Sequence, residues 1–496
     1  MVPAELDAVQ ARRLIGAGEL SPLELLASCI SEIERIDPVV NALITKAFER
    51  ARAEARSAEA AVLRGRALGP LHGLPVAIKD IQATAGIRTT YGSADFEHNV
   101  PEQDDGIVAR IRAAGGVVIG KTNVPERSIG ANTVNRLFGA TANPFDVDLT
   151  CGGSSGGSAV AVATHMAALA TGSDHGGSLR IPACYCGVVG LRASPGVVPN
   201  EQRAITQTHY SVQGPMGRSV ADTALLLSVI AQRSNRTRLD PMAFPLEAAD
   251  FAALRRRDVA ALRVAVTADL GGVMVSESVR RTFAERVARL ERLVAVCDWH
   301  PIDLTGAPDV DWHLRQDVFV TQYAREAGNW DESFNPNVRV TYESALATPM
   351  ADIARARRLQ MELYQTFAAI FDDYDLVICP GVSIPPFPWK HLNPRFIDGQ
   401  PVQNYMAWLA LTSSITVVGH PVVALPFGLD SRGTPFGIQV IGPMYGDRDL
   451  LEAALALEQA FASDPALRRP QPNLDVLAST PSDCRTLGRN VQGSSA

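Results

Sequence analysis

The stretch from Cys151 to Ser194 constrains this chain more than any other part of its sequence. A glycine–serine run at 151–158 precedes the mostly small, apolar residues 159–170, and a second cluster, Gly176-Gly177-Ser178, follows them. Glycine lets backbone approach backbone or ligand closely because it has no Cβ. Residues 159–170 are apolar nearly all round, which predicts a helix buried on every side. Two hydroxyl-bearing turns on one rigid support indicate a functional site and not a flexible linker.

Three motifs within this stretch resemble the signature of the amidase signature family of serine hydrolases. They are GGSSGGSA from residue 152, GSDHGGSLRIPA from residue 172 and CGVVGLR from residue 186. The similarity extends from Leu71 to Ser194, with weaker similarity at 419–426 and 436–442. The resemblance implies an α/β fold in which one large twisted mixed β-sheet is covered on both faces by α-helices.

The resemblance also implies a Ser–cis-Ser–Lys triad. Ser178 would be the nucleophile, Ser154 the bridging serine in a cis backbone, and Lys79, at the end of the strand-like LPVAIKD, the base. A serine hydroxyl is a weak nucleophile that needs an adjacent base, and a buried lysine loses its proton readily. The expected enzyme is an amidase that hydrolyses the carbon–nitrogen bond of a small organic amide, or a related carbamate or ester, through an acyl-enzyme.

The second glycine–serine cluster also predicts how a developing oxyanion would be stabilised. A glycine turn can direct consecutive N–H groups at one point, and the expected donors are the backbone amides of His175, Gly176, Gly177 and Ser178. In relatives an acid and a base beside this turn support the loop. We expect Asp174 and Arg180, together with Ser155, to support the reacting groups without reacting themselves.

Two features leave the substrate open. Leu149-Thr150-Cys151 and Ser173-Asp174-His175 depart from the sequences that many relatives carry at these places. The A subunit of a glutaminyl-tRNA amidotransferase has the same triad, releases ammonia from glutamine and delivers it to a partner protein, and it is the main alternative. A non-catalytic binding protein is a weaker one, because all three triad residues are present.

Two other motifs in the sequence match unrelated enzymes. Gly153 to Gly157 fits the GxSxG turn of α/β-hydrolases, but that turn needs an apolar strand before it, and residues 143–150 are polar and interrupted by proline. Gly115 to Thr122 fits the phosphate-binding pattern GxxxxGK[ST], but its central residues Val117-Val118-Ile119 are themselves strand-like. We therefore reject the nucleotide site and rank the α/β-hydrolase as a weaker alternative.

Charge and cysteine content restrict the partners. The net charge of −7 argues against nucleic acid or an anionic membrane, so the expected partner is a small-molecule amide, and a homodimer stays open. The seven cysteines are odd in number and scattered, which fits reduced thiols. Cys184-x-Cys186 has the wrong spacing for zinc, so no metal or cofactor is expected. Without a secretory leader pattern or a long apolar run, we expect a cytoplasmic protein.

The chain divides into three parts by pattern. Residues 1–66 form an N-terminal helical segment packing on the main body, 67–470 the catalytic domain, and 471–496 a mobile, dispensable C-terminal tail. In the first part, Ser21-Pro22-Leu23-Glu24 is a capping box that starts a helix, and Asp37-Pro38 is expected to end it. An aromatic-rich stretch either walls the substrate pocket or belongs to the core; its members are Trp299, Trp312, Phe319, Tyr323, Trp330 and Phe334.

Overall fold

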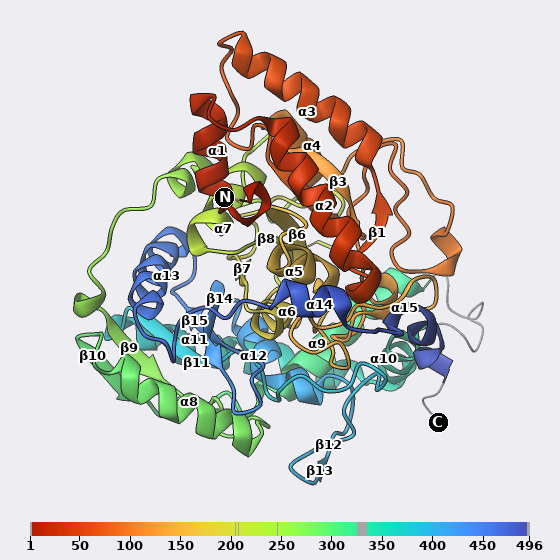
Figure 1. The fold of residues 1–496 in the computed structure, drawn as a ribbon. Helices are drawn as coiled ribbons and strands as arrows, with labels where there is room; N and C mark the ends of the chain where they lie inside the picture. The colour runs from red at the N-terminus through yellow and green to blue at the C-terminus, as the bar shows by residue number, and fades with distance from the viewer. Residues whose placement is uncertain (1, 204, 207, 246, 325–334, 494–496) are drawn as a thin grey trace.

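One mixed sheet of eleven strands forms the centre of the protein in the computed structural model, which describes residues 2–203, 205–206, 208–245, 247–324 and 335–493 (Figure 1). This confirms the expected α/β architecture. In spatial order the strands are β1 (Leu43–Lys46), β3 (Val117–Thr122), β2 (Pro75–Lys79), β6 (Leu169–Asp174), β8 (Val212–Gly217), β7 (Val189–Arg192), β14 (Val422–Leu429), β15 (Pro435–Ile441), β11 (Leu376–Pro380), β9 (Arg263–Val266) and β10 (Val296–Trp299). Two short ribbons lie outside it, β4 (Val134–Asn135) with β5 (Gly139–Ala140) and β12 (Phe396–Ile397) with β13 (Gln400–Pro401).

Helices cover both faces of this sheet. They are α1 (Ala8–Ala17), α2 (Pro22–Val40), α3 (Phe48–Leu63), α4 (Gly106–Ala113), α5 (Gly156–Ala163), α6 (Arg180–Cys186), α7 (Val220–Ile230), α8 (Glu277–Leu290), α9 (Ala307–Tyr323), α10 (Pro336–Ala347), α11 (Met350–Ala368), α12 (Ala410–Val418), α13 (Asp447–Ala462), α14 (Leu474–Ser479) and α15 (Cys484–Leu487). In Figure 1, α1, α2 and α3 lie together at one end of the molecule, and α8 with β9 and β10 lies at the opposite end. Helices α7 and α13 pack in one core cluster, and α5 and α6 in a second.

The face on which Lys79 lies follows from the alternation of side chains along β2. Val76 and Ile78 belong to the core cluster that contains α7, whereas Ala77 belongs to the cluster that contains α5. Successive side chains of a strand point to opposite faces, so Lys79 shares the face of Ala77 and is directed toward α5. Strand β2 runs parallel to its neighbour β6, and therefore the carboxyl ends of both strands meet at one edge of the sheet.

Helix α2 begins where its capping box predicts but ends later than expected. The Ser21 hydroxyl accepts from two backbone amides of the first turn, and Glu24 accepts from the Ser21 amide. The prediction that Asp37-Pro38 ends the helix was wrong, because α2 continues to Val40. A proline in the last turn removes only one backbone bond. Beyond the helix, the buried Asp37 carboxylate accepts from the amides of Ala42 and Leu43, both at 2.8 Å.

The segment 159–170 is only partly the buried helix that its composition predicts. Helix α5 ends at Ala163, and from Leu169 the chain is the strand β6. His165 has a φ of 60°, a left-handed conformation that stops the helix. Strand β6 then pairs with β2 on one side and β8 on the other, so tertiary hydrogen bonding decided the local structure.

The C-terminal segment after residue 470 contacts the N-terminal part of the chain. Helix α14 packs against α2, and α15 against β5. Cys484 Sγ lies 3.3 Å from the Val39 carbonyl oxygen, and the Arg485 guanidinium donates to the Asp37 carbonyl oxygen at 3.2 Å. The mobility of this tail and the three-part division of the chain stay predictions. In the described part of the chain, no helix is long and apolar enough to cross a membrane.

Candidate active site

Lys79 is the centre of the polar site at the carboxyl edge of β2 and β6. The side chain is fully buried, and its Nζ lies within hydrogen-bond distance of three serine hydroxyls: Ser154 at 2.8 Å, Ser155 at 2.9 Å and Ser173 at 2.9 Å. Burial lowers the pKa of Lys79 to about 7, against a partial opposing effect of the Asp174 carboxylate. A substantial fraction of the amine is therefore neutral near neutral pH, which is the form that can accept a proton.

The hydroxyls around Lys79 suit a neutral amine. A neutral lysine has two N–H donors and one lone pair, so three hydroxyl partners can satisfy it completely when one of them donates. The Ser155 hydroxyl donates to the Ser173 carbonyl oxygen at 3.2 Å, so it accepts from Lys79. The Ser154 hydroxyl, at 2.8 Å, is thereby available as the donor to the amine lone pair.

Ser154 and Ser155 are held by the chain that enters α5. The Gly153–Ser154 peptide bond is cis, the backbone form that the family resemblance implies for Ser154. Ser155 is the residue before the first residue of α5, and both serines are buried. In the described chain, only isolated bridges and no strand occupy residues 141–150, so the turn at Ser155 lacks the strand that a GxSxG turn requires.

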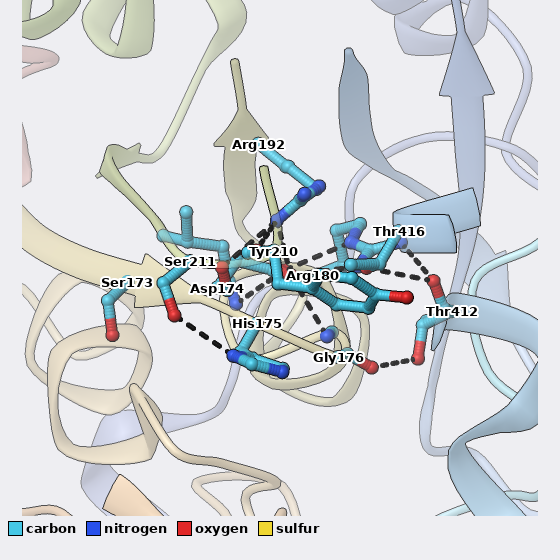
Figure 2. Close-up of polar contacts among 12 residues, drawn as sticks. Ser173, Asp174, His175, Gly176, Arg180, Arg192, Tyr210, Ser211, Thr412 and Thr416 are labelled. Atoms are coloured by element: carbon cyan, nitrogen blue, oxygen red, sulfur yellow. Dashed lines mark hydrogen bonds and ion pairs between the residues drawn. The ribbon is translucent and has the colours of Figure 1, made fainter. Parts of the chain in front are cut away.

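The glycine turn at 175–178 is shaped by the carboxylate of Asp174 (Figure 2). Asp174 Oδ1 accepts from the Gly177 amide and Oδ2 from the Leu179 amide, both at 3.0 Å. Gly177 has a φ of 129°, and a Cβ there would meet the Thr412 side chain, so only glycine fits. The Gly177 amide is thus engaged, whereas among the described residues the amides of His175, Gly176 and Ser178 have no acceptor.

Two buried arginines hold Asp174 in place (Figure 2). Arg180 donates to both carboxylate oxygens, Nε to Oδ2 at 3.0 Å and NH2 to Oδ1 at 2.8 Å. Arg192 NH1 lies 3.3 Å from Oδ1 and donates to the Asp174 carbonyl oxygen at 3.0 Å. Burial alone would raise the pKa of Asp174, but the two guanidinium groups bring it far below its usual range. Arg180 also donates to the Thr412 carbonyl oxygen at 2.7 Å, which joins the turn to α12.

His175 is a neutral member of the turn. Desolvation and the nearby Arg315 and Arg192 lower its pKa well below the usual range. Its Nδ1 lies 2.9 Å from Ser211 Oγ, and its ring packs beside that of Tyr210, as Figure 2 shows. These contacts hold the imidazole on Ser211 and Tyr210.

Ser178 is half-buried in the wall of a large cavity. The cavity has a volume of about 720 Å³ and is also lined by Ser154, Ser173, His175 and Gly176. Within the part of the chain that the structure describes, the Ser178 hydroxyl makes no hydrogen bond, and its carbonyl oxygen accepts from the Ser155 amide at 3.2 Å. Catalytic hydrogen bonds are often long before substrate binds, so this geometry is compatible with a nucleophile at rest.

The aromatic-rich stretch divides between the cavity and other surroundings. Phe319 lines the cavity, and Tyr323 is buried against it with ring centroids 5.7 Å apart. Trp299 is 50% exposed at the far edge of the sheet, and Trp312 packs against the core cluster that contains α5. Trp330 and Phe334 lie outside the described residues.

Several residues that the fold brings to this site were not predicted from the sequence. In the sequence, Ser173 is noted only because it departs from the residue that many relatives carry. It lies two residues after Thr171 along β6 and therefore on the same face of the strand. The Thr171 hydroxyl accepts from the Lys79 amide at 3.0 Å, and the Ser173 hydroxyl contacts the Lys79 amine. Arg192 ends the CGVVGLR motif, which assigns it no role. Arg315 lines the cavity from α9, far along the chain from the signature. No group of three metal-ligating side chains occurs in the described portions of the chain.

Comparison with known proteins gives one consistent family. The Amidase family profile matches residues 24–451. An acylamidase from Rhodococcus erythropolis is 30% identical over 459 residues, covering 91% of this chain and 95% of the relative. The A subunit of the glutamyl-tRNA(Gln) amidotransferase of Moorella thermoacetica is 32% identical over 490 residues, covering 94% and 98%. The crystal structure of a bacterial aryl acylamidase of the amidase signature family superposes with a TM-score of 0.85 at 26% identity, covering 96% of this chain and 99% of that one.

Proposed function

This chain belongs to the Amidase family, and from that membership we propose that it hydrolyses a small organic amide through an acyl-enzyme on Ser178. Its action on carbon–nitrogen amide bonds follows from the family; the residues that act are our proposal. The observation that carries the proposal is the buried Lys79 Nζ at 2.8 Å from Ser154 Oγ, in a site where Ser154 and Ser178 line the same cavity.

The proposed reaction starts with a proton relay. Neutral Lys79 takes the proton of Ser154, which takes that of Ser178 as the Ser178 oxygen attacks the substrate carbonyl carbon. The backbone amides of His175, Gly176 and Ser178 in the turn stabilise the resulting oxyanion. The relay then returns the proton to the leaving amine as the carbon–nitrogen bond breaks. Water attacks the acyl-enzyme by the same route and releases the acid.

The supporting residues fix the geometry of this relay. Asp174, held by Arg180 and Arg192, orders the turn through the Gly177 and Leu179 amides. Ser155 fills a second position on Lys79, which leaves the lone pair to Ser154. We propose that these side chains position the reacting groups without exchanging protons with substrate.

A fluorophosphonate probe tests the nucleophile directly. Wild type should be labelled, and Ser178→Ala should not be, because the phosphorus bonds to the activated serine oxygen. Ser155→Ala is the matched control: it removes a hydroxyl that also contacts Lys79, and it should still be labelled. Labelling that survives in Ser178→Ala and disappears in Ser155→Ala would favour the GxSxG interpretation.

A screen of aryl, fatty and amino-acid amides, carbamates and glutamine then identifies the substrate.

The amidotransferase subunit is the second candidate, and it is supported by the relative from Moorella thermoacetica at 32% identity. That function requires a stable partner protein that receives ammonia. Purification of the untagged chain from its source under mild conditions separates the two: a free-standing amidase elutes alone with full activity, whereas an amidotransferase subunit elutes with other chains and hydrolyses glutamine.

A further inference from the structure

Arg315 is a buried cation in the wall of the catalytic cavity. It lies on α9, its side chain is only 5% exposed, and it lines the cavity that contains Ser178. A Cβ built on Gly176 would stand 3.3 Å from Arg315 NH2, so the guanidinium lies directly beside the turn that would hold the oxyanion. Neither the sequence motifs nor the proposed relay gives this residue a role.

The hydrogen-bonding groups of Arg315 are only partly used. NH1 lies 3.4 Å from the Tyr405 hydroxyl, and NH2 lies 3.5 Å from Asp311 Oδ1, one helical turn earlier on α9. Within the described residues, Nε and NH2 have no hydrogen-bond partner although both are buried. These two nitrogens form one edge of the guanidinium, the edge that binds both oxygens of a carboxylate at once.

The surroundings of Arg315 favour a bound anion. The rings of Phe319 and Tyr405 lie 5.9 and 6.0 Å from the guanidinium carbon, and a low-polarity wall strengthens a charged hydrogen bond. Asp311 balances part of the charge and holds the guanidinium from its own helix. By contrast, Arg203 lines the same cavity but is already paired with a carboxylate. Its Nε donates to Asp240 at 2.9 Å, and its NH2 lies 3.4 Å from the same carboxylate.

We propose that Arg315 binds a carboxylate of the substrate, so that this enzyme prefers amides carrying a carboxylate close to the scissile bond. The inference rests on the proposed function, because it assigns the substrate class of that same site. Two arrangements place the carboxylate within reach of the turn. It belongs either to the acyl part, as in a half-amide of a short dicarboxylic acid, or to the amine part, as in an N-acylated amino acid.

Matched substrate pairs test this preference. The pairs are succinamate with butyramide for the acyl side, and N-acetylglycine with N-propylacetamide for the amine side. In wild type, kcat/KM should be about 10- to 100-fold higher for the charged member of one pair than for its neutral member, because a hydrogen bond to a charged group typically contributes that much. R315M should abolish that ratio, mainly by raising KM for the charged member of the pair. R315K, which keeps the charge and loses the two-pronged edge, should be intermediate.

The controls separate the possible failures. R203M should keep the wild-type ratio, because Arg203 is already paired with Asp240. Fluorophosphonate labelling of Ser178 reports whether each variant is folded, and protection from the probe by succinate or N-acetylglycine gives the same answer without turnover. An equal loss of kcat/KM for both members in R315M, which leaves the wild-type ratio in place, would overturn the role of Arg315 alone. The absence of both a charged preference and protection in wild type would do the same. Absence of labelling in wild type would instead remove the proposed function.

Discussion

At the scale of single residues, the proposed mechanism depends on a lysine that is buried with hydroxyls instead of a carboxylate. Surface lysines are protonated because water stabilises the ammonium form. Lys79 has lost that water, and desolvation brings its pKa to about 7 although Asp174 acts in the opposite direction. The nearby carboxylate does not restore the charge, because Arg180 and Arg192 already neutralise Asp174.

Ser173 provides a test of this balance. Its hydroxyl accepts from Lys79 Nζ at 2.9 Å, and such a bond favours the ammonium form. Ser173→Ala should therefore lower the pKa of Lys79 and move the acid limb of the kcat/KM profile to lower pH, with fluorophosphonate labelling retained. Ser211→Ala, which removes a hydroxyl just before the neighbouring strand β8, is the control and should leave the limb in place. A shift to higher pH in Ser173→Ala would contradict the assigned hydrogen bonding.

At the scale of elements, the site exists because β2 and β6 are parallel neighbours. Their carboxyl ends bring Lys79 together with Ser173 and Asp174, and the chain entering α5 supplies Ser154 and Ser155 to the same edge. Asp174 then joins β6 to α6 through Arg180 and to β7 through Arg192. A buried carboxylate shared by two guanidinium groups connects three elements at one point.

Asp174→Asn should therefore be strongly destabilising. Removing one charge of a buried cluster leaves the others uncompensated and typically costs about 3–5 kcal/mol. Urea unfolding would measure the loss. Asp464→Asn is the control, because its partner Arg289 is 48% exposed and an exposed pair is worth at most about 1 kcal/mol. Because the pKa of Asp174 is depressed in the folded state, the contribution of its charge to the free energy of unfolding should be fully present above the unfolded-state pKa of about 3.9. That contribution should disappear only as the pH falls below this value. Equal losses in the two variants would contradict the cluster's role.

The same elements show what local sequence can and cannot predict. The strand ending at Lys79 and the start of α2 at Ser21 follow from short patterns, and the structure has both. The helix expected across 159–170 failed because β6 pairs with strands on both sides, a preference that no local pattern contains. Ser173 and Arg315 were missed for the same reason: their positions depend on which strands and helices become neighbours.

At the scale of the whole molecule, the C-terminal segment packs on helix α2 and strand β5, which lie far from it in the sequence. Residues after 470 pack α14 on α2 and α15 on β5, and they bury Leu477, Cys484 and Val491. None of these contacts involves the residues around Lys79.

Deleting 471–496 should thus separate stability from catalysis. Loss of several buried apolar side chains, each worth about 1.5–3 kcal/mol, should lower the Tm and the free energy of unfolding. The kcat/KM should stay close to the wild-type value. Thermal unfolding and steady-state kinetics on the same preparation measure both. An unchanged Tm would instead support the mobile, dispensable tail that the composition predicts.

The measurement that tests the central claim most directly is the pH dependence of kcat/KM in wild type and in lysine variants. We expect wild-type kcat/KM to rise with an apparent pKa of about 7 and then level off, because only neutral Lys79 accepts the proton. Lys79→Ala should lower kcat/KM about 100- to 10,000-fold and should abolish its rise with pH. Lys79→Arg should be no more active, because a guanidinium stays protonated. A Lys79→Ala enzyme with near-native kcat/KM and an unchanged profile, alongside a His175→Ala enzyme that has lost both, would contradict the Ser–Ser–Lys mechanism.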